Sequence, residues 1–460
     1  MIRETILDKI LFNVKRLIPK LVFNFFQPAY HTALAYTGAL LYGFPSKKIK
    51  VIGITGTKGK STVVYLTAKI LEGAGKNIAM CGSLGFRIKD KEWPNTLKMT
   101  MPGRFRLQKF LYEAKKAGCK YVVLEVTSEG IKQKRHLGIT FDCAVFTNLH
   151  KEHIESHGSF EKYYQAKQEL FSLTKNIHVI NADDPNTELF GNFSAKHKIF
   201  YGLKKGDLVP DKVTPTAEGM SFELYGTHFN TYLAGEFNVF NCLAAFGVGV
   251  MYGLDLPSMK PILESVKSIP GRMEYLPAFV KTSAGEAAKH FNVVVDYAHT
   301  PDSLEAVYRT LKSEIRNPKS ETNSKLEIQN SKSRLICVLG AAGGGRDKWK
   351  RPEFGRIAAE YCDEIILTNE DPYDENPASI LDEIEAGFSQ VSNTKPQITK
   401  ILDRKEAIKT ALTKANDGDT VIITGKGSET SMAVAGGKKI PWSDKEVVRQ
   451  VVNFLKSEDR

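Results

Sequence analysis

Cysteine and tryptophan are scarce in this 460-residue sequence, which has six of the first and three of the second. The cysteines lie far apart and form no Cys-x-x-Cys pair, so neither a disulfide framework nor a zinc ribbon is expected. We expect reduced thiols and a cytoplasmic location. The six are Cys81, Cys119, Cys143, Cys242, Cys337 and Cys362.

Long hydrophobic runs are also missing. The most apolar window, residues 33–44, is too short to cross a bilayer as one helix. The start shows no short apolar core followed by a small-residue cleavage site, so no signal peptide is expected. Hydrophobic residues make up 42% and charged residues 25%, which excludes collagen, coiled coil and wholesale disorder. The length predicts two or three domains.

Acidic residues are rare at the start of the chain. Residues 1–50 contain eight Lys or Arg against Glu4 and Asp8, so they hold +6 of the formal net charge of +12. An apolar stripe predicts an amphipathic helix over residues 2–26, kinked near Pro19, and a second helix over 30–42. Residues 1–48 are therefore a basic helical segment. Residues 1–46 either touch an anionic membrane surface peripherally at its inner face or pack on the rest of the protein.

Strands and helices alternate from residue 50 onward, which predicts an α/β fold. Apolar strands are expected at 51–54, 121–124, 143–146 and 178–180, antiparallel strands over 207–236, and helices at 238–252 and 258–268. A second series follows at 293–295, 335–339, 364–367 and 420–423. We expect a central ATP-binding P-loop domain with a parallel sheet over 49–270 and a Rossmann-like domain over 271–460. Residues 313–334 should be a flexible insertion.

A glycine-rich loop joins the first of these strands to a helix. It reads Gly53-Ile-Thr-Gly56-Thr57-Lys-Gly59-Lys60-Ser61-Thr62. Such a loop wraps a phosphate with its backbone amides, while Lys60 neutralises phosphate charge and Ser61 can bind Mg²⁺. A strict Walker motif has its first glycine at position 54, which is isoleucine here. Nucleotide-phosphate binding is the prediction, against the alternative of an ordinary glycine-rich turn.

Several ionisable residues follow at strand ends or at helical spacing. Glu125 ends an apolar strand, where it can face the phosphate loop or simply be exposed. His150, His153 and His157 are spaced to share one helical face, so a zinc site competes with the simpler interpretation that one of them acts alone. Lys167 would ordinarily be a surface charge.

The second strand series ends in polar loops that should meet at one sheet edge, where ligands bind in such folds. No aromatic–basic stacking pattern accompanies the basic segment, so nucleic acid is not an expected partner. The loops are Pro270–Glu274, Asp296–Pro301, Gly343–Lys348, Thr368–Pro372 and Gly425–Glu429.

Over about residues 49–460, these motifs together resemble the Mur ligases, ATP-dependent amide-forming enzymes of peptidoglycan precursor synthesis. The resemblance is strongest to the branch that adds a third, usually diamino, residue to UDP-N-acetylmuramoyl-L-alanyl-D-glutamate. The segments that carry it are Glu125–Arg135, Thr147–His153, Tyr164–Lys167, Gly235–Asn241, Pro270–Glu274 and Asp296–Ser303.

The resemblance implies a role for each matching residue. Gly56, Thr57, Gly59, Lys60, Ser61 and Thr62 would hold ATP, with Asn238 and Asn241 at the adenine and Arg272 and Asp296 reaching the phosphate and ribose. Ser61, Glu125, His153 and a carbamylated Lys167 would surround two Mg²⁺ ions, and Lys60, Glu125, His153 and Lys167 would be the catalytic set. Muramoyl contacts would come from Thr100, Ser128, Gln133 and Arg135, and amino-acid contacts from Arg346, Glu370, Asp371, Tyr373, Gly427 and Glu429.

The implied reaction converts the D-glutamyl carboxylate to an acyl phosphate, which the incoming amine attacks. Closure of the two domains would bring Arg346 and Glu429 toward it. Three departures stand out. The family's uridine-binding N-terminal domain is missing or reduced to about fifty residues, so the dipeptide could be carried on UDP or on a lipid. Residues 1–46 would then either replace that domain or dock on the membrane face. Glu129 replaces a histidine. The loop that reads Asp-Asn-Pro-Arg in diaminopimelate-adding enzymes is Glu370-Asp371-Pro372-Tyr373 here, which leans toward lysine or ornithine over diaminopimelate.

Two other functions compete with this one. The same ATPase core resembles folylpolyglutamate synthases, which join glutamate to a pteridine compound. A non-catalytic nucleotide-binding scaffold at the membrane is the second alternative.

Overall fold

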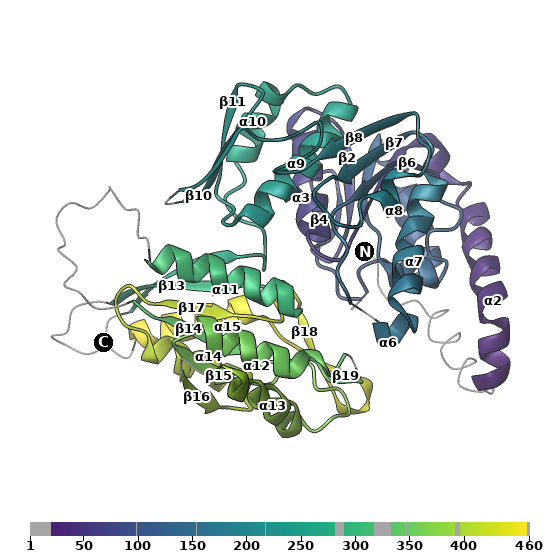
Figure 1. Ribbon diagram of the computed structural model, residues 1–460. Helices are drawn as coiled ribbons and strands as arrows, with labels where there is room; N and C mark the ends of the chain where they lie inside the picture. Colours follow the sequence, from purple (N-terminus) through teal and green to yellow (C-terminus); the bar gives the residue numbers. More distant parts are fainter. Residues whose placement is uncertain are drawn as a thin grey trace.

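The computed structural model describes residues 20–97, 99–152, 154–216, 218–280, 289–316, 333–345, 347–391 and 396–457. The predictions for His153, for Arg346, for residues 1–19 and for most of the insertion at 313–334 lie outside the described residues. The remainder forms two halves, each built around its own sheet, which are coloured purple to teal and green to yellow in Figure 1.

The central half contains an eight-stranded sheet in the order β4-β3-β2-β5-β1-β6-β7-β8. All neighbours from β2 to β8 are parallel, whereas β3 and β4 form an antiparallel edge. The middle strands are apolar along their whole length because helices cover both faces. The strands are β1 Lys50–Thr55, β2 Ile78–Gly82, β3 Gly85–Ile88, β4 Lys91–Trp93, β5 Tyr121–Glu125, β6 Phe141–Phe146, β7 Ile177–Asn181 and β8 His197–Tyr201.

Two buried clusters lie on the two faces of this sheet. One packs against α3 (Lys60–Gly73), α9 (Glu236–Met251) and α10 (Leu256–Glu264). The other packs against α4 (Arg104–Lys116) and α7 (Phe160–Leu173). Three short helices lie in the connections, namely α5 Ser128–Lys132, α6 Ile154–His157 and α8 Glu188–Gly191.

A small antiparallel sheet, ordered β11-β10-β9, follows the eight-stranded sheet in the chain. Its strands are β9 Lys212–Thr216, β10 Gly219–Leu224 and β11 Thr227–Thr231. Phe222 and Phe229 stack at 5.2 Å between ring centroids, and Phe229 also contacts Phe246 of α9. This contact joins the small sheet to the larger core.

The C-terminal half contains a six-stranded sheet in the order β12-β13-β17-β14-β15-β16, parallel except for β12. The strands are β12 Glu274–Val280, β13 Lys289–Val295, β14 Leu335–Leu339, β15 Glu364–Leu367, β16 Gln397–Lys400 and β17 Thr420–Ile423. One face packs on α11 (Pro301–Arg316), α12 (Lys350–Tyr361) and α13 (Pro377–Glu385), and the other on α14 (Arg404–Lys414) and α15 (Asp444–Ser457). A hairpin of β18 (Ser431–Val434) and β19 (Lys438–Pro441) adjoins it. The α/β fold class is confirmed.

The described part of the N-terminal segment is one helix, not two. Helix α2 runs from Lys20 to Leu41 without a break, packs against α4, and is followed by the 3₁₀ turn η1 (Pro45–Lys48). The gap expected between residues 26 and 30 is therefore wrong, since the backbone stays helical through it. Among the helices that the structure describes, none has both the length and the hydrophobicity to cross a membrane.

One expectation about cysteine is also wrong. Cys337 and Cys362 form a disulfide, with their Cα atoms 6.2 Å apart, whereas the other four cysteines are free and buried. Cys337 lies in β14, and Cys362 lies just before β15, the neighbouring strand. Sheet pairing brings together two residues whose separation of 25 in the sequence matches no recognisable spacing motif.

Candidate active site

One cavity of about 1010 Å³ lies between the two halves. Loops that follow β1, β5 and β6 line it from the central half, and loops that follow β13, β14, β15 and β17 line it from the C-terminal half. The parallel strands of both sheets thus direct their carboxyl ends to the same cavity, as expected for an α/β binding site.

The phosphate loop, residues 56–61, forms part of the cavity wall between β1 and α3. Gly56 and Gly59 have φ of +149° and +78°, a backbone region that other residues rarely adopt. The Asn148 side chain accepts from the Lys58 backbone N–H at 2.8 Å, and the Thr57 hydroxyl bonds the buried Tyr163 hydroxyl at 2.9 Å. Asn148 and Tyr163 therefore hold the loop in place, and the N-terminus of α3 faces the cavity.

Lys60 begins α3 and lies in the cavity wall. Its Nζ donates to the Thr57 carbonyl oxygen at 2.7 Å, which bends the side chain back over the loop. Burial lowers the pKa of Lys60, and the neighbouring carboxylates of Glu125 and Glu152 oppose that shift. An anion placed in the loop would meet this ammonium group and the helix N-terminus together.

Ser61 and Glu125 form the part of the predicted metal site that lies in the described residues. The Ser61 hydroxyl donates to Glu125 Oε1 at 3.0 Å, and the Ser83 N–H donates to Oε2 at 2.7 Å. Arg272, from the other half, donates to the Ser61 hydroxyl at 3.0 Å. The oxygens of Ser61 and Glu125 are hard ligands, the kind that Mg²⁺ prefers. Within the described ranges, which omit His153, no three His, Cys, Asp or Glu side chains gather as a metal site.

Lys167 is buried beneath the phosphate loop, with 2% of its surface exposed. Its Nζ donates to the Gly56 carbonyl oxygen at 2.6 Å and lies 4.5 Å from the centre of the Tyr163 ring. Burial, together with repulsion from Lys60, lowers the pKa of Lys167 well below its ordinary value. The sequence-based alternative of a surface charge is excluded by this position.

The predicted nucleotide residues beyond the loop reach the same cavity. Asn241 donates to Asn238 Oδ1 at 2.9 Å, and its own Oδ1 lies so close to Gly59 that a side chain there would collide with it. Asp296 accepts from the N–H groups of Met273 and Ala298, both at 2.6 Å. Burial raises the pKa of Asp296.

The four residues matched to muramoyl contacts form one group on the central half. Thr100 bonds Ser83 through their hydroxyls at 2.9 Å, and Ser128 lies 3.2 Å from His157 Nε2. Arg135 donates to Gln133 Oε1 at 2.7 Å, and burial lowers the pKa of this guanidinium. All four line the cavity.

Two loops of the C-terminal half bring carboxylates to a buried lysine that the sequence reasoning did not assign. Lys426 is fully buried, and its Nζ lies 2.8 Å from Asp371 Oδ1 and 2.5 Å from Glu429 Oε2. Both carboxylates raise the pKa of Lys426, whereas burial raises that of Glu370. Glu370, Asp371, Tyr373 and Glu429 all line the cavity. The only sequence signal for Lys426 was its place in the Gly425–Glu429 loop.

Other predicted positions differ from expectation. Gly56 begins the phosphate loop, with its carbonyl oxygen turned to Lys167 beneath the loop, and Gly427 packs against the Gly271 carbonyl oxygen. Neither glycine lines the cavity. His150 and His157 do not share one helical face, because α6 begins at Ile154 and His150 precedes it in a loop. His150 lies 3.7 Å from Asp302, whereas His157 faces Ser128, so the zinc alternative has no support from these two.

Three features define a nucleotide-dependent enzyme of the P-loop class: a phosphate loop, a pair of oxygen ligands suited to Mg²⁺, and two sheets whose carboxyl ends meet at one cavity. Comparison with known proteins places it further. Residues 54–249 match the family description "Mur ligase middle domain", and residues 271–427 match "Mur ligase, glutamate ligase domain". A protein of Geobacillus thermodenitrificans named UDP-N-acetylmuramoyl-L-alanyl-D-glutamate--2,6-diaminopimelate ligase is 34% identical over 438 residues, which is 92% of this chain and 83% of the relative.

Solved structures agree with this placement. One described as a UDP-N-acetylmuramoyl-L-alanyl-D-glutamate--2,6-diaminopimelate ligase has a TM-score of 0.57 at 29% identity, covering 88% of this chain and 78% of its own. The folylpolyglutamate synthase of Mycobacterium tuberculosis has a TM-score of 0.64 at 16% identity, covering 86% and 92%, which shows a shared fold alone. The chain belongs to the Mur ligase family, and it is an ATP-dependent ligase that forms amide bonds.

Proposed function

We propose that this enzyme joins diaminopimelate to UDP-N-acetylmuramoyl-L-alanyl-D-glutamate in peptidoglycan precursor synthesis. The observation that carries the proposal is the cavity between the halves, which has the phosphate loop on one wall and the Lys426 carboxylate cluster on the other. The names of the similar proteins supply the substrates.

The identity of the incoming amino acid depends on Tyr373. This residue stands where the resembling diaminopimelate-adding enzymes have an arginine that would pair with the distal carboxylate of the substrate. The lean toward lysine or ornithine assumes that the acidic side chains of Glu370 and Asp371 face the pocket and meet a distal ammonium. Asp371 Oδ1 accepts from Lys426 Nζ at 2.8 Å and from the Ala433 N–H at 2.7 Å, so Lys426 already compensates the charge of this carboxylate. Burial raises the pKa of Glu370, which disfavours its charged form. This weakens the lean toward lysine, and diaminopimelate is the acceptor that the relatives' names support.

In the proposed mechanism the D-glutamyl carboxylate attacks the terminal phosphorus of ATP and releases ADP. The amine of the incoming amino acid then attacks the acyl carbon of the acyl phosphate, which forms the amide bond, expels inorganic phosphate and releases a proton. The amides of the phosphate loop and Lys60 would hold the phosphates. Arg272 and Asp296 would approach the nucleotide from the opposite half, with Asn238 and Asn241 beside its base. Ser61 and Glu125 would hold Mg²⁺, which offsets charge on the transferring group.

Carbamylation of Lys167 belongs to the same proposal. Carbamate formation adds CO₂ to a neutral amine and releases a proton, so it requires an unprotonated nitrogen. The depressed pKa of Lys167 supplies that form at a lower pH than an ordinary lysine would. The product is an anion beneath the phosphate loop, which suits a neighbouring Mg²⁺.

The muramoyl dipeptide would lie against Thr100, Ser128, Gln133 and Arg135. Because Arg135 and Gln133 hold each other at 2.7 Å, they would present a fixed pair of donors to an anionic or amide-bearing ligand. The amino acid would approach from the opposite wall, near Glu370, Asp371, Tyr373 and Glu429.

We also propose a weak peripheral contact of the N-terminal segment with anionic membrane at the cytoplasmic face. Helix α2 leaves Tyr36, Leu40 and Leu41 exposed by 49%, 69% and 69%, and Lys47 and Lys48 follow in η1. Apolar side chains beside basic ones favour interfacial binding. In flotation with anionic liposomes at low salt the full chain should rise with the vesicles. A chain that stays at the bottom contradicts this contact.

A ligation assay tests the main proposal. Purified enzyme with ATP and Mg²⁺ is offered the muramoyl dipeptide on UDP or on a lipid, crossed with meso-diaminopimelate, lysine and ornithine. We expect ADP release and tripeptide formation with the UDP-linked acceptor and diaminopimelate. Preference for lysine would correct the amino acid, and preference for the lipid carrier would correct the acceptor. Product formed only from glutamate and a pteridine acceptor would favour the folylpolyglutamate alternative, and no product with any pair would favour the scaffold.

A further inference from the structure

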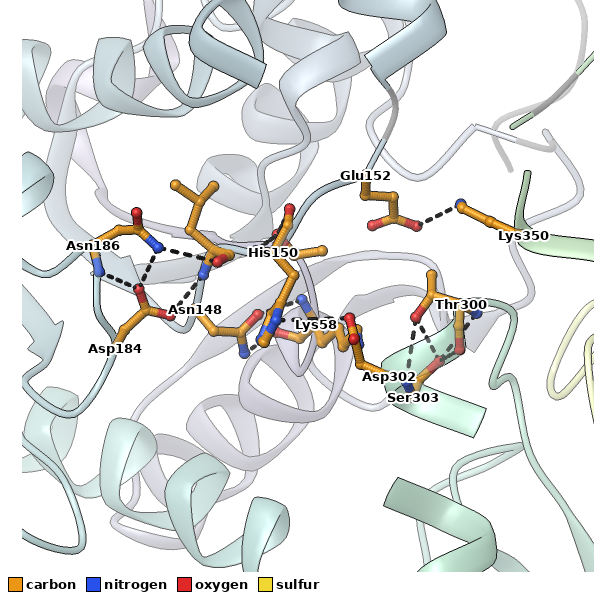
Figure 2. A network of polar contacts seen from close by, with 12 residues as sticks. Lys58, Asn148, His150, Glu152, Asp184, Asn186, Thr300, Asp302, Ser303 and Lys350 are labelled. Atoms are coloured by element: carbon orange, nitrogen blue, oxygen red, sulfur yellow. Dashed lines mark hydrogen bonds and ion pairs between the residues drawn. The ribbon is translucent and has the colours of Figure 1, made fainter. Parts of the chain in front are cut away.

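The Lys58 side chain leaves the phosphate loop and reaches the other half of the protein. Its backbone is fixed on both sides, because its N–H donates to Asn148 Oδ1 at 2.8 Å and its carbonyl oxygen accepts from the Thr147 hydroxyl at 2.6 Å. Its Nζ donates to Asp302 Oδ2 at 2.7 Å, across 244 residues of sequence (Figure 2). Asp302 lies in the first turn of α11, directly after the Asp296–Pro301 loop.

The segment that follows β6, which contains His150, Glu152 and Glu155, also contacts the C-terminal half. Glu152 Oε1 lies 3.7 Å from Lys350 Nζ (Figure 2). The same oxygen lies 3.6 Å from His299 Nε2. Glu155 Oε2 accepts from the Asp347 N–H at 2.7 Å. Phosphate loop and segment are also tied together, since the His150 N–H donates to the Thr57 hydroxyl at 2.9 Å. A movement of one half relative to the other would therefore displace the phosphate loop.

The Lys58–Asp302 pair is poorly suited to stabilise the fold. The two side chains are 21% and 56% exposed, and ion pairs this open to water contribute little to stability. Solvated pairs do favour one relative placement of two surfaces over others. Both partners also adjoin the cavity, next to residues assigned above to the nucleotide.

We propose that Lys58 and Asp302 are positioning residues that couple the phosphate loop to the C-terminal half. With the pair intact, the Asp296–Pro301 loop and its Asp296 are held opposite the phosphate loop. Without the pair, each half keeps its own ligand contacts, but the two cavity walls no longer have a fixed position relative to each other. Nucleotide binding would survive, and turnover would fall. The activity readout of this inference rests on the proposed function.

Reciprocal charge exchange tests the pair. Asp302→Lys and Lys58→Asp each place like charges together, and each should lower kcat about five- to tenfold while the Kd for ATP changes less than twofold. The double exchange, Lys58→Asp with Asp302→Lys, should restore kcat to within about threefold of the parent. Asp302→Asn, which only removes the charge, should give a smaller loss in the same direction and keeps the test open if the double variant does not fold.

Glu305→Lys is the matched control, because Glu305 lies one turn further along α11 and pairs with Arg309 of the same helix. It should leave kcat unchanged. Amide hydrogen exchange gives a readout independent of ligation: Asp302→Lys should accelerate exchange in residues 56–60, and Glu305→Lys should not. Equal behaviour of the two variants in exchange, or a double exchange no better than the single changes, would overturn the inference. Absence of ligation by the parent would count against the proposed function alone.

Discussion

Lys167 shows how one buried side chain can be costly to the fold and useful to the chemistry. An ammonium group removed from water, with Lys60 nearby, is unfavourable, and the depressed pKa expresses that cost. The Gly56 carbonyl oxygen accepts from Lys167 Nζ at 2.6 Å. Conversion to a carbamate would turn this cation into an anion without moving the side chain out of its position.

Lys167→Ala should therefore lose nearly all ligation, with partial recovery in added short carboxylic acids that can fill the vacated space with an anion. Steady-state ADP release with and without such an acid is the measurement. Lys162→Ala, at an exposed position of the same helix α7, is the control and should retain full activity. Full activity of the Lys167 variant without additives would refute the role.

Lys426 is the second residue whose charge is fully enclosed, and here the compensation is electrostatic. Replacing it with methionine would leave the buried Asp371 and the partly exposed Glu429 without their shared cation, which should cost about 3–5 kcal/mol of unfolding free energy. Adding Asp371→Asn removes one of the two stranded charges and should recover part of that loss. Urea unfolding of the single and double variants measures both. Equal stability of Lys426→Met and the parent would show that the cluster is not coupled as its distances indicate.

At the scale of the elements, the segment that joins the two halves packs directly on a site loop. Gly271 has φ of +61°, and a Cβ there would overlap the backbone of Gly427 and Ser428. Gly427 in turn has φ of +50° and would place a Cβ 2.7 Å from the Gly271 carbonyl oxygen. Two glycines from distant parts of the chain thus allow their backbones to touch.

Gly271→Ala should lower the free energy of unfolding by at least about 3 kcal/mol, since backbone strain and steric overlap add together. Gly253→Ala separates these contributions, because Gly253 has φ of +83° but no neighbouring atom within 4 Å of the added carbon. That control should cost about 1–2 kcal/mol, for the backbone conformation alone. Thermal and urea unfolding of both variants measure these losses in free energy of unfolding. A loss for Gly271→Ala no greater than that for Gly253→Ala would show that the two loops move apart to accept the added carbon.

The elements also show what the sequence could and could not predict. Strands with continuous apolar runs, such as β1, β5, β14 and β17, were identified because burial on both faces leaves a strong pattern. Edge strands such as β8 (His197–Tyr201) carry polar residues on their open side and gave no such pattern. The contacts of Lys58 and Lys426 and the burial of Lys167 were not predicted for another reason. Each of these lysines has a partner 55 to 244 residues away, and only folding brings the two together.

Each half has its own hydrophobic clusters, and Ala234 and Phe237 of the central half also pack into one cluster of the C-terminal half. The other described contacts between the cavity walls are largely ionic and hydrogen-bonded. Interfaces of this kind permit independent unfolding. Calorimetry of the unliganded protein should therefore resolve two transitions. ATP with Mg²⁺ at a hundredfold excess over its Kd should stabilise the central half by about 2.7 kcal/mol. A single transition, unchanged by nucleotide, would contradict this.

The contact between Gly271 and Gly427 also constrains how this sequence can drift over time. A residue larger than glycine at position 271 could be accepted only if the Gly425–Glu429 loop had first retreated, and that retreat would carry Glu429 and the Lys426 cluster with it. Substitution at the junction is thus tied to substitution in a loop that begins more than 150 positions later. In a broad set of related sequences the two positions should change as a pair or stay as they are.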